Sequence, residues 1–316
     1  MFRLDRFLTL YFFRSLLKKI PKSKELGIPI LMYHSISNDK IKNMHPYYET
    51  NTTLADFSGQ MKFLYENDYS VISLFDAIQI LSSQHIMFKG NNFNQSNLSS
   101  EIHAYDSEAN LTGSNPSNNK RINFAVITFD DGFHSFYADA YPILEKYGFT
   151  ADVFLPTAYL GDENVKFKSK KCMSWGEVRE LYRFGISFGS HTVNHPVLYE
   201  MKKIENDYEL RYSKRKMEDE IGGSITSFSY PFAFPGHDYK FVRMFRDLLI
   251  KNGYEVGVTT QIGKATIKDG TFFMKRLPVN SFDDINFFRA KLEGAYDWVY
   301  HIQKMFKSLK PLLKKR

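Results

Sequence analysis

The amino-acid sequence predicts an α/β protein, a deformed barrel of about seven strand–helix units related to the TIM barrel. Short apolar runs that are typical of strands alternate with helical patterns over most of the 316 residues. This alternation predicts a parallel sheet, and with no linker between the units it favours one closed or nearly closed barrel over an open sheet. Residues able to bind metal or act in catalysis directly follow several of the strands, at the rim where such barrels place their chemistry.

The elements follow one another in a regular order along the chain. Apolar runs predict strands over 28–33, 69–72, 124–129, 151–155, 186–190, 225–230 and 254–259. Helical patterns predict helices over 54–66, 74–81, 134–147, 175–184, 204–220 and 239–251. Gly148, Gly185, Gly222 and Gly253 follow four of these helices, and glycine is typical of the left-handed residue that ends a helix.

Three segments are expected to differ from the regular body of the barrel, a single domain that is predicted to occupy residues 25–300. Residues 1–24 are a basic segment that also contains Phe, Leu and Tyr, and residues 301–316 are a basic tail. Residues 89–121 interrupt the barrel with a polar insertion. This insertion is rich in Asn and Ser and nearly lacks apolar periodicity, so we expect it to be disordered at the surface.

The positive charge of the chain is concentrated at its two ends. The net charge is +7, whereas residues 1–24 carry +6 and residues 302–316 carry another +6. Because the two ends together carry +12, the rest of the chain carries −5. A nucleic-acid enzyme would concentrate positive charge around its working face, so no nucleic-acid partner is expected. The ends are interpreted as solvated tails or as membrane-surface contacts.

No segment has the features of a transmembrane span or of a secretory signal. The longest uncharged run near the N-terminus, 7–13, is too short to cross a bilayer, and no cleavage site of small residues follows it. We therefore expect a cytoplasmic protein, or one peripheral to the inner membrane of a bacterium. Apolar residues within 298–309 share one helical face, which favours packing on the domain body over membrane docking. Cys172 is the only cysteine, so no internal disulfide forms.

Two clusters of polar residues predict a metal-dependent hydrolase. Asp130 and Asp131 directly follow an apolar strand, and His191 and His195, four residues apart, begin where a later strand ends. One carboxylate and two imidazoles are a common ligand set for a catalytic divalent metal ion, with positions left open for water and substrate. The cation would also offset the repulsion between the aspartates, leaving Asp130 free to act as a base. The alternative is a turn that caps the next helix, with two surface histidines.

Three motifs, in this order, resemble those of the NodB-type polysaccharide deacetylases, which are metal-dependent amidases that remove N-acetyl groups from carbohydrate chains. They are Thr128-Phe-Asp-Asp-Gly132, His191-Thr-Val-Asn-His195 and Phe228-Ser-Tyr-Pro-Phe232. The resemblance covers most of residues 27–280. It implies a NodB-like barrel and a divalent metal cofactor, with Zn2+ as the expected ion.

The resemblance also implies a role for each residue of the candidate site. Asp130 would be the catalytic base, and Asp131, His191 and His195 would be the metal ligands. The backbone N–H at Tyr230 would help to hold the oxyanion of the tetrahedral intermediate.

The opening segment, Ile28-Pro-Ile-Leu-Met-Tyr-His-Ser-Ile36, is similar to one branch of this family, which includes extracellular poly-N-acetylglucosamine deacetylases. In that branch the histidine of Tyr-His is placed to serve as the general acid, which implies this role for His34. A neutral leaving amine needs a proton, and an imidazole can supply it near neutral pH. The alternative for His34 is a strand-end histidine bonded to a neighbouring carbonyl.

The chain departs from the family pattern in two respects. The arginine that orients the base in the third motif is absent, because Phe228 and Ser229 offer nothing equivalent. Arg276 is the candidate to replace it from a later strand. No Leu-x-His motif occurs near the C-terminus, so His34 must supply the acid.

Three further residues are left outside the predicted site. Trp175 is interpreted as a packing residue more readily than as a wall of a sugar groove. His134 follows the first motif closely, but we expect it to cap a helix. His237 lies on a predicted loop beyond the third motif.

Together these observations predict hydrolysis of the N-acetyl amide of a carbohydrate, with release of acetate. The expected substrate is an N-acetylated glycan or glycolipid. One alternative is a deformylase, or a deacetylase of lipid-linked sugars or lipopolysaccharide intermediates. A non-catalytic sugar-binding barrel is a further alternative, and the loss of a ligand or of the base would favour it; all four residues are present.

Overall fold

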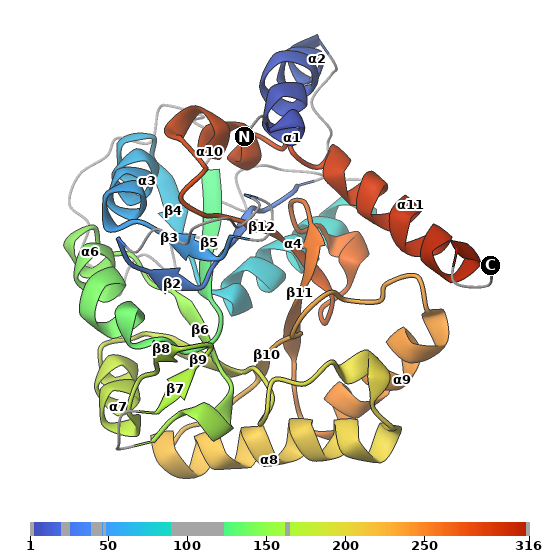
Figure 1. The fold of residues 1–316 in the computed structure, drawn as a ribbon. Coiled ribbons are helices and arrows are strands. Elements are labelled where there is room, and N and C mark those ends of the chain that lie inside the picture. The colour runs from blue at the N-terminus through green and yellow to red at the C-terminus, as the bar shows by residue number, and fades with distance from the viewer. Residues whose placement is uncertain are drawn as a thin grey trace.

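The computed structural model describes residues 3–19, 26–38, 46, 49–89, 123–161 and 165–313. The predicted polar insertion at 89–121 lies outside the described residues, apart from Lys89 at the end of a helix. Within the described ranges, the polypeptide forms one barrel surrounded by helices (Figure 1).

Seven parallel strands close into the barrel, as the sequence predicts. In order around the ring they are β1 (Ile30–Tyr33), β12 (Met274–Pro278), β11 (Val256–Ile262), β10 (Ser227–Ser229), β9 (Ser187–Ser190), β6 (Asp152–Leu155) and β5 (Asn123–Phe129). The pairing of β5 with β1 completes the ring. All seven carboxyl ends therefore point to the same rim, which the predicted site residues require.

Strand β4 (Tyr69–Val71) lies outside the closed ring although the sequence predicts a strand there. It pairs with the beginning of β5, with Tyr69 opposite Asn123, whereas β1 pairs with the rest of β5, with Ile30 opposite Val126. The two strands thus share one edge of β5 in succession. The ring closes instead through β12, a strand absent from the predicted series.

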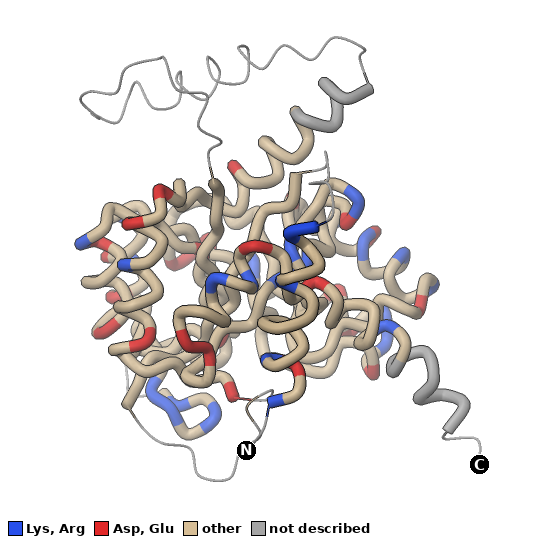
Figure 2. Tube along the Cα trace, turned by 90° about the horizontal axis from the view of Figure 1, so that it is seen from above, with Lys and Arg blue, Asp and Glu red and all other residues tan. Residues whose placement is uncertain are grey.

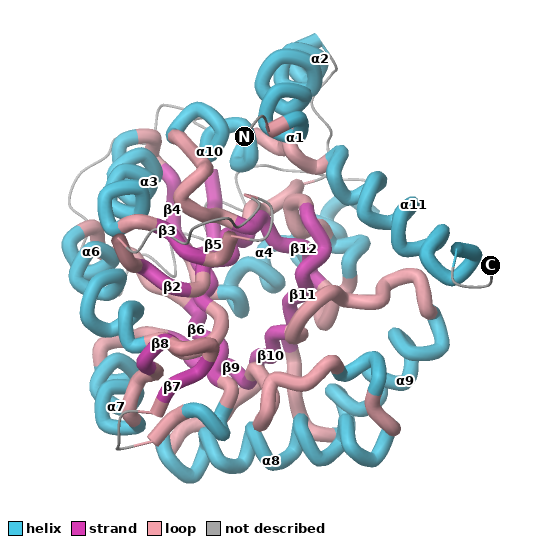
Figure 3. The backbone as a smooth tube through the Cα atoms, in the orientation of Figure 1, coloured by secondary structure: helices cyan, strands magenta, loops and turns pink. Residues whose placement is uncertain are grey.

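Helices cover the outside of the barrel (Figure 3). The main ones are α3 (Leu54–Glu66), α4 (Leu74–Lys89), α6 (Tyr141–Lys146), α7 (Trp175–Arg183), α8 (Lys203–Ile221), α9 (Tyr239–Lys251), α10 (Ile285–Leu292) and α11 (Trp298–Leu313). The helix predicted over 134–147 begins instead with a π-helical segment, η2 (Phe136–Ala140), and α10 is not predicted. Side-chain caps start several helices, as where Ser174 and Glu177 form a reciprocal capping box on α7.

Several short elements decorate the rim. Two two-stranded sheets lie there, β2 (Ser35–Ile36) with β3 (Asn51–Thr52), and β7 (Lys166–Phe167) with β8 (Lys170–Lys171). Single 3₁₀ turns, which are too short for a periodicity to indicate, occupy η3 (Thr157–Tyr159), η4 (Leu198–Glu200) and η5 (Ile267–Asp269).

Aromatic side chains fill much of the core between strands and helices. Tyr33 stacks on Phe129 with ring centroids 5.2 Å apart, and Phe57 meets both rings edge-on. Each fully buried side chain of this size stabilises the fold by about 1.5–3 kcal/mol relative to an exposed one. Trp175 belongs to the same core with 4% of its surface exposed, which confirms its packing role.

The N-terminal segment is a helix that packs on the barrel. It runs through α1 (Leu4–Phe7), the π-helical η1 (Leu8–Phe13) and α2 (Arg14–Lys19). Buried Thr9 accepts a hydrogen bond from the Trp298 indole at 3.1 Å, and Phe13 stacks on the same indole at 4.8 Å. Three arginines pair with acidic residues of, or next to, α10: Arg3 with Asp283, Arg6 with Asp284 and Arg14 with Glu293. The interpretation of residues 1–24 as a solvated tail is therefore wrong for residues 3–19.

The C-terminal helix α11 also contacts the domain body. Trp298 meets the N-terminal helix, and the side chain of Gln303 accepts a hydrogen bond from the backbone N–H of Ile262 at 2.9 Å. Lys275 lies over the ring of Tyr300 at 4.8 Å. In the described part of the chain, none of the helices combines the length and the apolar character that crossing a bilayer demands.

Candidate metal centre

Three strand ends bring the predicted base, acid and metal ligands to one rim of the barrel. His34 follows β1, Asp130 and Asp131 follow β5, and His191 follows β9. The pairing of β5 with β6 and of β6 with β9 sets the distance between the aspartates and the histidines. Residues more than fifty positions apart in the chain thus meet because the strands that precede them are neighbours.

Left-handed backbone conformations shape the turns that carry the ligands. Asp131 has φ = 72°, Thr192 has φ = 71° and His195 has φ = 51°. Residues other than glycine rarely adopt this region, and such strain concentrates at functional sites. Gly132 has φ = 63°, and a Cβ at this position would lie 2.9 Å from Leu155, so the Asp-Asp-Gly turn requires a glycine there.

Asp131, His191 and His195 form a compact, buried set of candidate metal ligands. The Oδ1 atom of Asp131 lies 3.3 Å from Nε2 of His195 and 3.7 Å from Nε2 of His191. One ligand atom from each residue lies within 4.8 Å of the other two. Bonds of about 2 Å to a tetrahedral zinc ion separate ligand atoms by roughly 3.3 Å. The Oδ1 atom is buried and accepts no hydrogen bond in the described structure, so these residues fit a divalent cation.

Hydrogen bonding determines which nitrogen of His191 faces the site. Its Nδ1 lies 2.8 Å from the carbonyl oxygen of Ser229, so Nδ1–H is the donor and Nε2 presents a free lone pair. Burial lowers the pKa of His191 to about 3, which keeps the imidazole neutral as a metal ligand must be. The ring of His195 is placed by aromatic contacts, with Phe167 at 5.1 Å and Phe232 at 4.6 Å between centroids.

A buried carboxylate on α8 holds the loop between the two histidines. Glu209 is 3% exposed, and its Oε2 accepts the backbone N–H groups of Val193 and Asn194 at 2.7 and 2.9 Å. Its Oε1 accepts the side-chain amide of Asn194 at 2.7 Å. The role of Glu209 in the site is not predicted from the sequence. Its only sequence signal is the spacing of Asn206, Glu209 and Ser213 on one helical face, and nothing in the sequence shows what that face meets.

The first aspartate of the pair, Asp130, is held by two hydrogen bonds from Arg276. Nη1 of Arg276 donates to Oδ1 at 2.8 Å, and Nη2 donates to Oδ2 at 2.7 Å. Arg276 is fully buried inside the barrel on β12. The prediction that it replaces the missing arginine of the third motif is consistent with this geometry. Ser229 also takes part, because its hydroxyl donates to Asp130 Oδ1 at 3.1 Å and accepts from Nη2 of Arg276 at 3.0 Å. Ser229 is no equivalent of the missing arginine, but its hydroxyl adds a hydrogen bond to the base that the sequence does not indicate.

Asp130 remains ionised in this environment. Burial raises the pKa of the carboxyl group, but the charge of Arg276 and its hydrogen bonds outweigh that effect and hold the pKa well below its usual range. A carboxylate oxygen has two lone pairs, and both lone pairs of Oδ1 face donors. Oδ2 receives one donor in the described structure, so Oδ2 is the atom with a lone pair left to accept a proton.

Lys168 holds the oxygen of Asp131 that does not face the histidines. Its Nζ lies 2.9 Å from Oδ2, while Oδ1 points toward the imidazoles. Lys168 and Ser169 form the two-residue loop between β7 and β8, and both have positive φ, at 51° and 65°. Such a loop normally favours Asn and Gly, so this hairpin is strained where it reaches the site. The sequence pattern does not indicate this contact.

Comparisons with known proteins agree with this arrangement. The family described as polysaccharide deacetylase matches residues 117–255. A Bacillus subtilis protein named for the same family, YxkH, is 26% identical over 275 residues, which is 87% of this chain and 79% of that protein. Over residues 117–255 this chain is therefore similar to members of the polysaccharide deacetylase family. Its members are hydrolases of carbon–nitrogen bonds.

More distant relatives share parts of the chain or the fold. The poly-β-1,6-N-acetyl-D-glucosamine N-deacetylase of Staphylococcus aureus is 25% identical over 163 residues, and the matched part spans 49% of this chain and about half, 53%, of that enzyme. The structure of the Streptococcus pyogenes deacetylase PplD, in complex with acetate, superposes with a TM-score of 0.62 at 22% identity, covering 85% of this chain and 99% of that one. IcaB from Ammonifex degensii superposes with a TM-score of 0.58 at 17% identity, covering 85% and 97%. These two superpositions support the deacetylase fold.

The structure corrects the role expected for Tyr230. The backbone N–H of Tyr230 donates to the carbonyl of Val258 at 3.0 Å, extending the pairing of β10 with β11. Its side chain is 2% exposed and packs among Phe234, Phe241 and Phe245. The N–H group that the resemblance assigns to the oxyanion is therefore already used within the sheet.

His34 is close enough to the aspartates to interact with them electrostatically. Burial lowers the pKa of His34, and the negative charges of Asp131 and Asp130 partly oppose this change. Lys168 and Arg276 reinforce the lowering. The resting imidazole is thus neutral over a wider pH range than that of an ordinary histidine.

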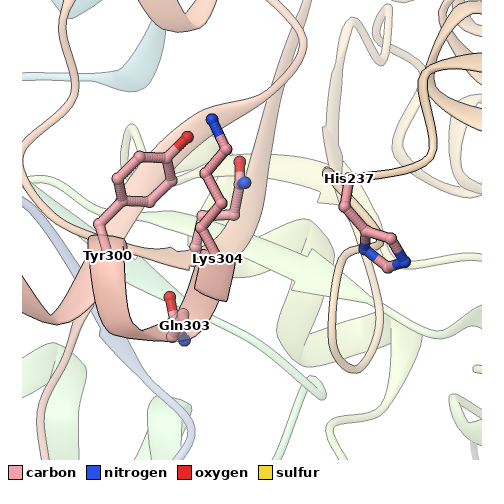
Figure 4. A pocket seen from close by; sticks show the side chains of 6 residues that line it. His237, Tyr300, Gln303 and Lys304 are labelled. Carbon is pink, nitrogen blue, oxygen red and sulfur yellow. The ribbon is translucent and has the colours of Figure 1, made fainter. Parts of the chain in front are cut away.

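The two remaining histidines that the sequence analysis set aside lie outside the ligand set. Nδ1 of His134 is 3.0 Å from Glu177, the residue that completes the capping box of α7. His237 lines a small polar pocket with Gln261, Tyr300 and Gln303, between the loop after β10 and helix α11 (Figure 4).

Proposed function

We propose that this deacetylase hydrolyses the N-acetyl amide of a carbohydrate, a glycan or glycolipid, and that it needs a divalent metal ion, Zn2+, to do so. The observation that carries the proposal is the juxtaposition of two buried units: the Asp131, His191 and His195 ligand set, and the Asp130 carboxylate clamped by Arg276. The family and the chemistry of the donor set support it. The staphylococcal relative, by its name, acts on an N-acetylated polysaccharide.

The two units divide the reaction between them. A zinc ion on the three ligands would polarise the amide carbonyl and lower the pKa of an attacking water. Asp130 accepts the proton of that water on Oδ2, the oxygen with a lone pair to spare. Arg276 and Ser229 fix the plane of the carboxylate, so Oδ2 stays directed at the reacting atoms.

Bond making and bond breaking then proceed as in other amide hydrolyses. The water oxygen bonds to the acetyl carbon, the C–N bond breaks, and the amine leaves with a proton, giving acetate and a free amino sugar. His34 delivers that proton from its imidazolium form, and the proton that Asp130 took from the water later restores this form. Its place next to Asp130 follows from the pairing of β1 with β5, in which the Asp130 N–H donates to the carbonyl of Tyr33 at 3.0 Å. The charges of Asp130 and Asp131 favour its protonated form during this step.

Phe232 is our candidate for the oxyanion donor in place of Tyr230. Its backbone N–H donates to no acceptor within the described residues, and its φ of 55° turns this peptide out of the strand direction. Its ring contacts His195, a proposed metal ligand, with 4.6 Å between centroids. A free N–H beside the ligands is what stabilisation of a developing oxyanion needs.

A panel assay tests this function. Acetate release would be measured from N-acetylated glycans and glycolipids, and formate release from N-formyl analogues, with and without a chelator. We expect acetate release that the chelator abolishes and added zinc restores. Formate release without acetate release would assign a deformylase, and chelator-resistant acetate release would overturn the role of the metal.

A further inference from the structure

The N-terminal helix has two faces, and the face turned away from the barrel is apolar. Six side chains on this 16-residue helix each expose between 41% and 66% of their surface: Leu4, Phe7, Tyr11, Phe12, Leu16 and Leu17. Single exposed apolar residues are ordinary, but a group of this size on one short helix indicates a contact surface. We call these six residues the apolar face.

The charges of the helix are divided in the same way. Arg3, Arg6 and Arg14 are used to dock the helix, since each pairs with an acidic residue in or next to α10. Lys18 and Lys19 follow the apolar face at the end of α2, are exposed, and form no ion pair with any described residue. Among the described residues, the apolar face is therefore bordered by two lysines that have no ionic partner.

The start of α11 packs on the N-terminal helix, since Phe13 stacks on Trp298, the residue that begins α11. In the sequence, residues 1–24 and residues 302–316 each carry +6. The rest of the chain carries −5. Figure 1 shows α1 and α2 projecting from one side of the barrel, and Figure 2 looks down on that side, with Lys and Arg in blue.

We propose that the apolar face, with Lys18 and Lys19, docks on the surface of a lipid bilayer that contains anionic lipids. Leucine and aromatic side chains enter the boundary between headgroups and acyl chains, and lysines beside them are attracted to anionic headgroups. The helix lies on the membrane in this arrangement and does not cross it. This proposal is independent of the hydrolase function.

A second copy of the chain fits this face less well than a bilayer does. A symmetric dimer brings the same patch of both copies together, so it would set Lys18 and Lys19 of one copy against those of the other. Like charges placed face to face oppose association. An anionic surface turns the same charges into attraction.

Vesicle co-sedimentation of the full chain tests the proposal. We expect the protein to sediment with phosphatidylcholine vesicles that contain phosphatidylglycerol, and not with pure phosphatidylcholine vesicles. Salt should weaken the binding, because Debye screening shortens to about 3 Å at 1 M salt. Equal binding to both vesicle types, or no binding to either, would overturn the proposal.

Two double variants locate the surface. Tyr11→Ser with Phe12→Ser removes part of the apolar face, and Lys18→Glu with Lys19→Glu reverses the charge. Each should weaken vesicle binding on the order of tenfold or more, since each lysine near an anionic surface contributes about 1 kcal/mol. The matched control is Ile204→Ser with Tyr239→Ser, two residues that are 75% and 76% exposed on α8 and α9, across the barrel from α1 and α2 in Figure 1.

The control variant should bind vesicles as the unmodified chain does, and circular dichroism should show that all three variants fold. Equal loss of binding in the control would overturn the assigned surface. Gel filtration without lipid measures whether the apolar face binds a second copy of the chain. A dimer that Tyr11→Ser with Phe12→Ser dissociates, together with no vesicle binding, would assign the face to self-association instead.

Discussion

Arg276 and Asp130 form a two-point ion pair across the interior of the barrel, 146 residues apart in the chain, with hydrogen bonds of 2.8 and 2.7 Å. The guanidinium group reaches the base from β12, on the opposite side of β1 from β5. It also donates to the carbonyl of Thr259 at 2.9 Å, which fixes its own position. The orientation of the base therefore depends on closure of the ring by β12.

Removal of this arginine should damage both stability and catalysis. Arg276→Met leaves the buried carboxylate of Asp130 without its partner, which costs about 3–5 kcal/mol in the free energy of unfolding. The pKa of Asp130 should rise toward its ordinary range, because burial would no longer be outweighed. Urea denaturation measures the loss of stability. Hydrolysis rates measure the loss of catalysis.

Arg276→Lys serves as the matched control for charge. Lysine keeps the positive charge but cannot donate to both carboxylate oxygens in the planar arrangement of arginine. We expect it to recover most of the stability and little of the activity. Full activity in the lysine variant would show that charge alone, and not orientation, is what Asp130 requires.

The sequence predicts the strand ends of this site well and its supporting contacts poorly. The ligands and the base stand in short motifs after apolar strands, where spacing and chemistry identify them together. Glu209 and Lys168 contact residues on other elements, Val193 and Asp131. The local sequence around Glu209 and Lys168 does not indicate these contacts. Arg276 is foreseen only as a candidate, because its role depends on which strand closes the ring.

The backbone explains the remaining differences between prediction and structure. The role expected for the Tyr230 N–H fails because β10 and β11 continue to pair beyond the end of β10, and this pairing uses the N–H group. The docked N-terminal helix is missed because its arginines spread around the helical wheel in the sequence. Only the positions of Asp283, Asp284 and Glu293 show which arginines face inward.

Lys168 should determine how many oxygens of Asp131 bind the metal. In Lys168→Met the Oδ2 atom loses its partner and is free to join Oδ1 on the ion. For the cobalt-loaded protein, we expect weaker visible absorption, as a higher coordination number produces. Residues that hydrogen-bond a metal ligand without binding the metal contribute about 10–100-fold to metal affinity or activity. Turnover should therefore fall by about tenfold. An unchanged cobalt spectrum in Lys168→Met would count against this role. The control is Lys171→Met, which replaces an exposed lysine of the same hairpin and should leave the spectrum unchanged.

Glu209 should control metal affinity through the histidine loop. In Glu209→Gln one carboxylate oxygen becomes an amide nitrogen, which accepts no hydrogen bond. The remaining oxygen cannot accept the two backbone N–H groups of Val193 and Asn194 together with the side-chain amide of Asn194. The loop that carries His195 should loosen, and we expect zinc affinity to fall by about 10–100-fold. Competition with a chromophoric chelator measures this affinity. Asp219→Asn, at an exposed site on the same helix, should leave it unchanged.

Asp152 gives the fold a pH dependence that is separate from the active site. Burial raises the pKa of this carboxyl to about 7, with a smaller contribution from Asp76, although the Leu74 N–H donates to it at 2.9 Å. The folded state therefore holds its proton more tightly than the unfolded state, whose Asp pKa is about 3.9. Stability from this group is fully present below about pH 4 and is lost as pH rises toward 7, by up to about 1.4 kcal/mol per pH unit.

Asp152→Asn isolates this effect, because asparagine keeps an acceptor for Leu74 and carries no charge. We expect the variant to be more stable than the unmodified chain at pH 8, and the difference to shrink as the pH falls to 5. Urea denaturation at several pH values measures it. A difference that does not change with pH would mean that Asp152 does not bind its proton in this range.

The most direct test of the account compares Asp130→Asn with the unmodified chain at equal zinc content. Acetate release from an N-acetylated glycan that the unmodified enzyme hydrolyses is the readout, and elemental analysis confirms the zinc. The account predicts that the variant binds zinc as the unmodified chain does and loses at least about a hundredfold in turnover, since general base catalysis contributes about 10²–10⁴-fold. Turnover within a few fold of the unmodified enzyme, with zinc in place, would contradict the assignment of Asp130 as the base.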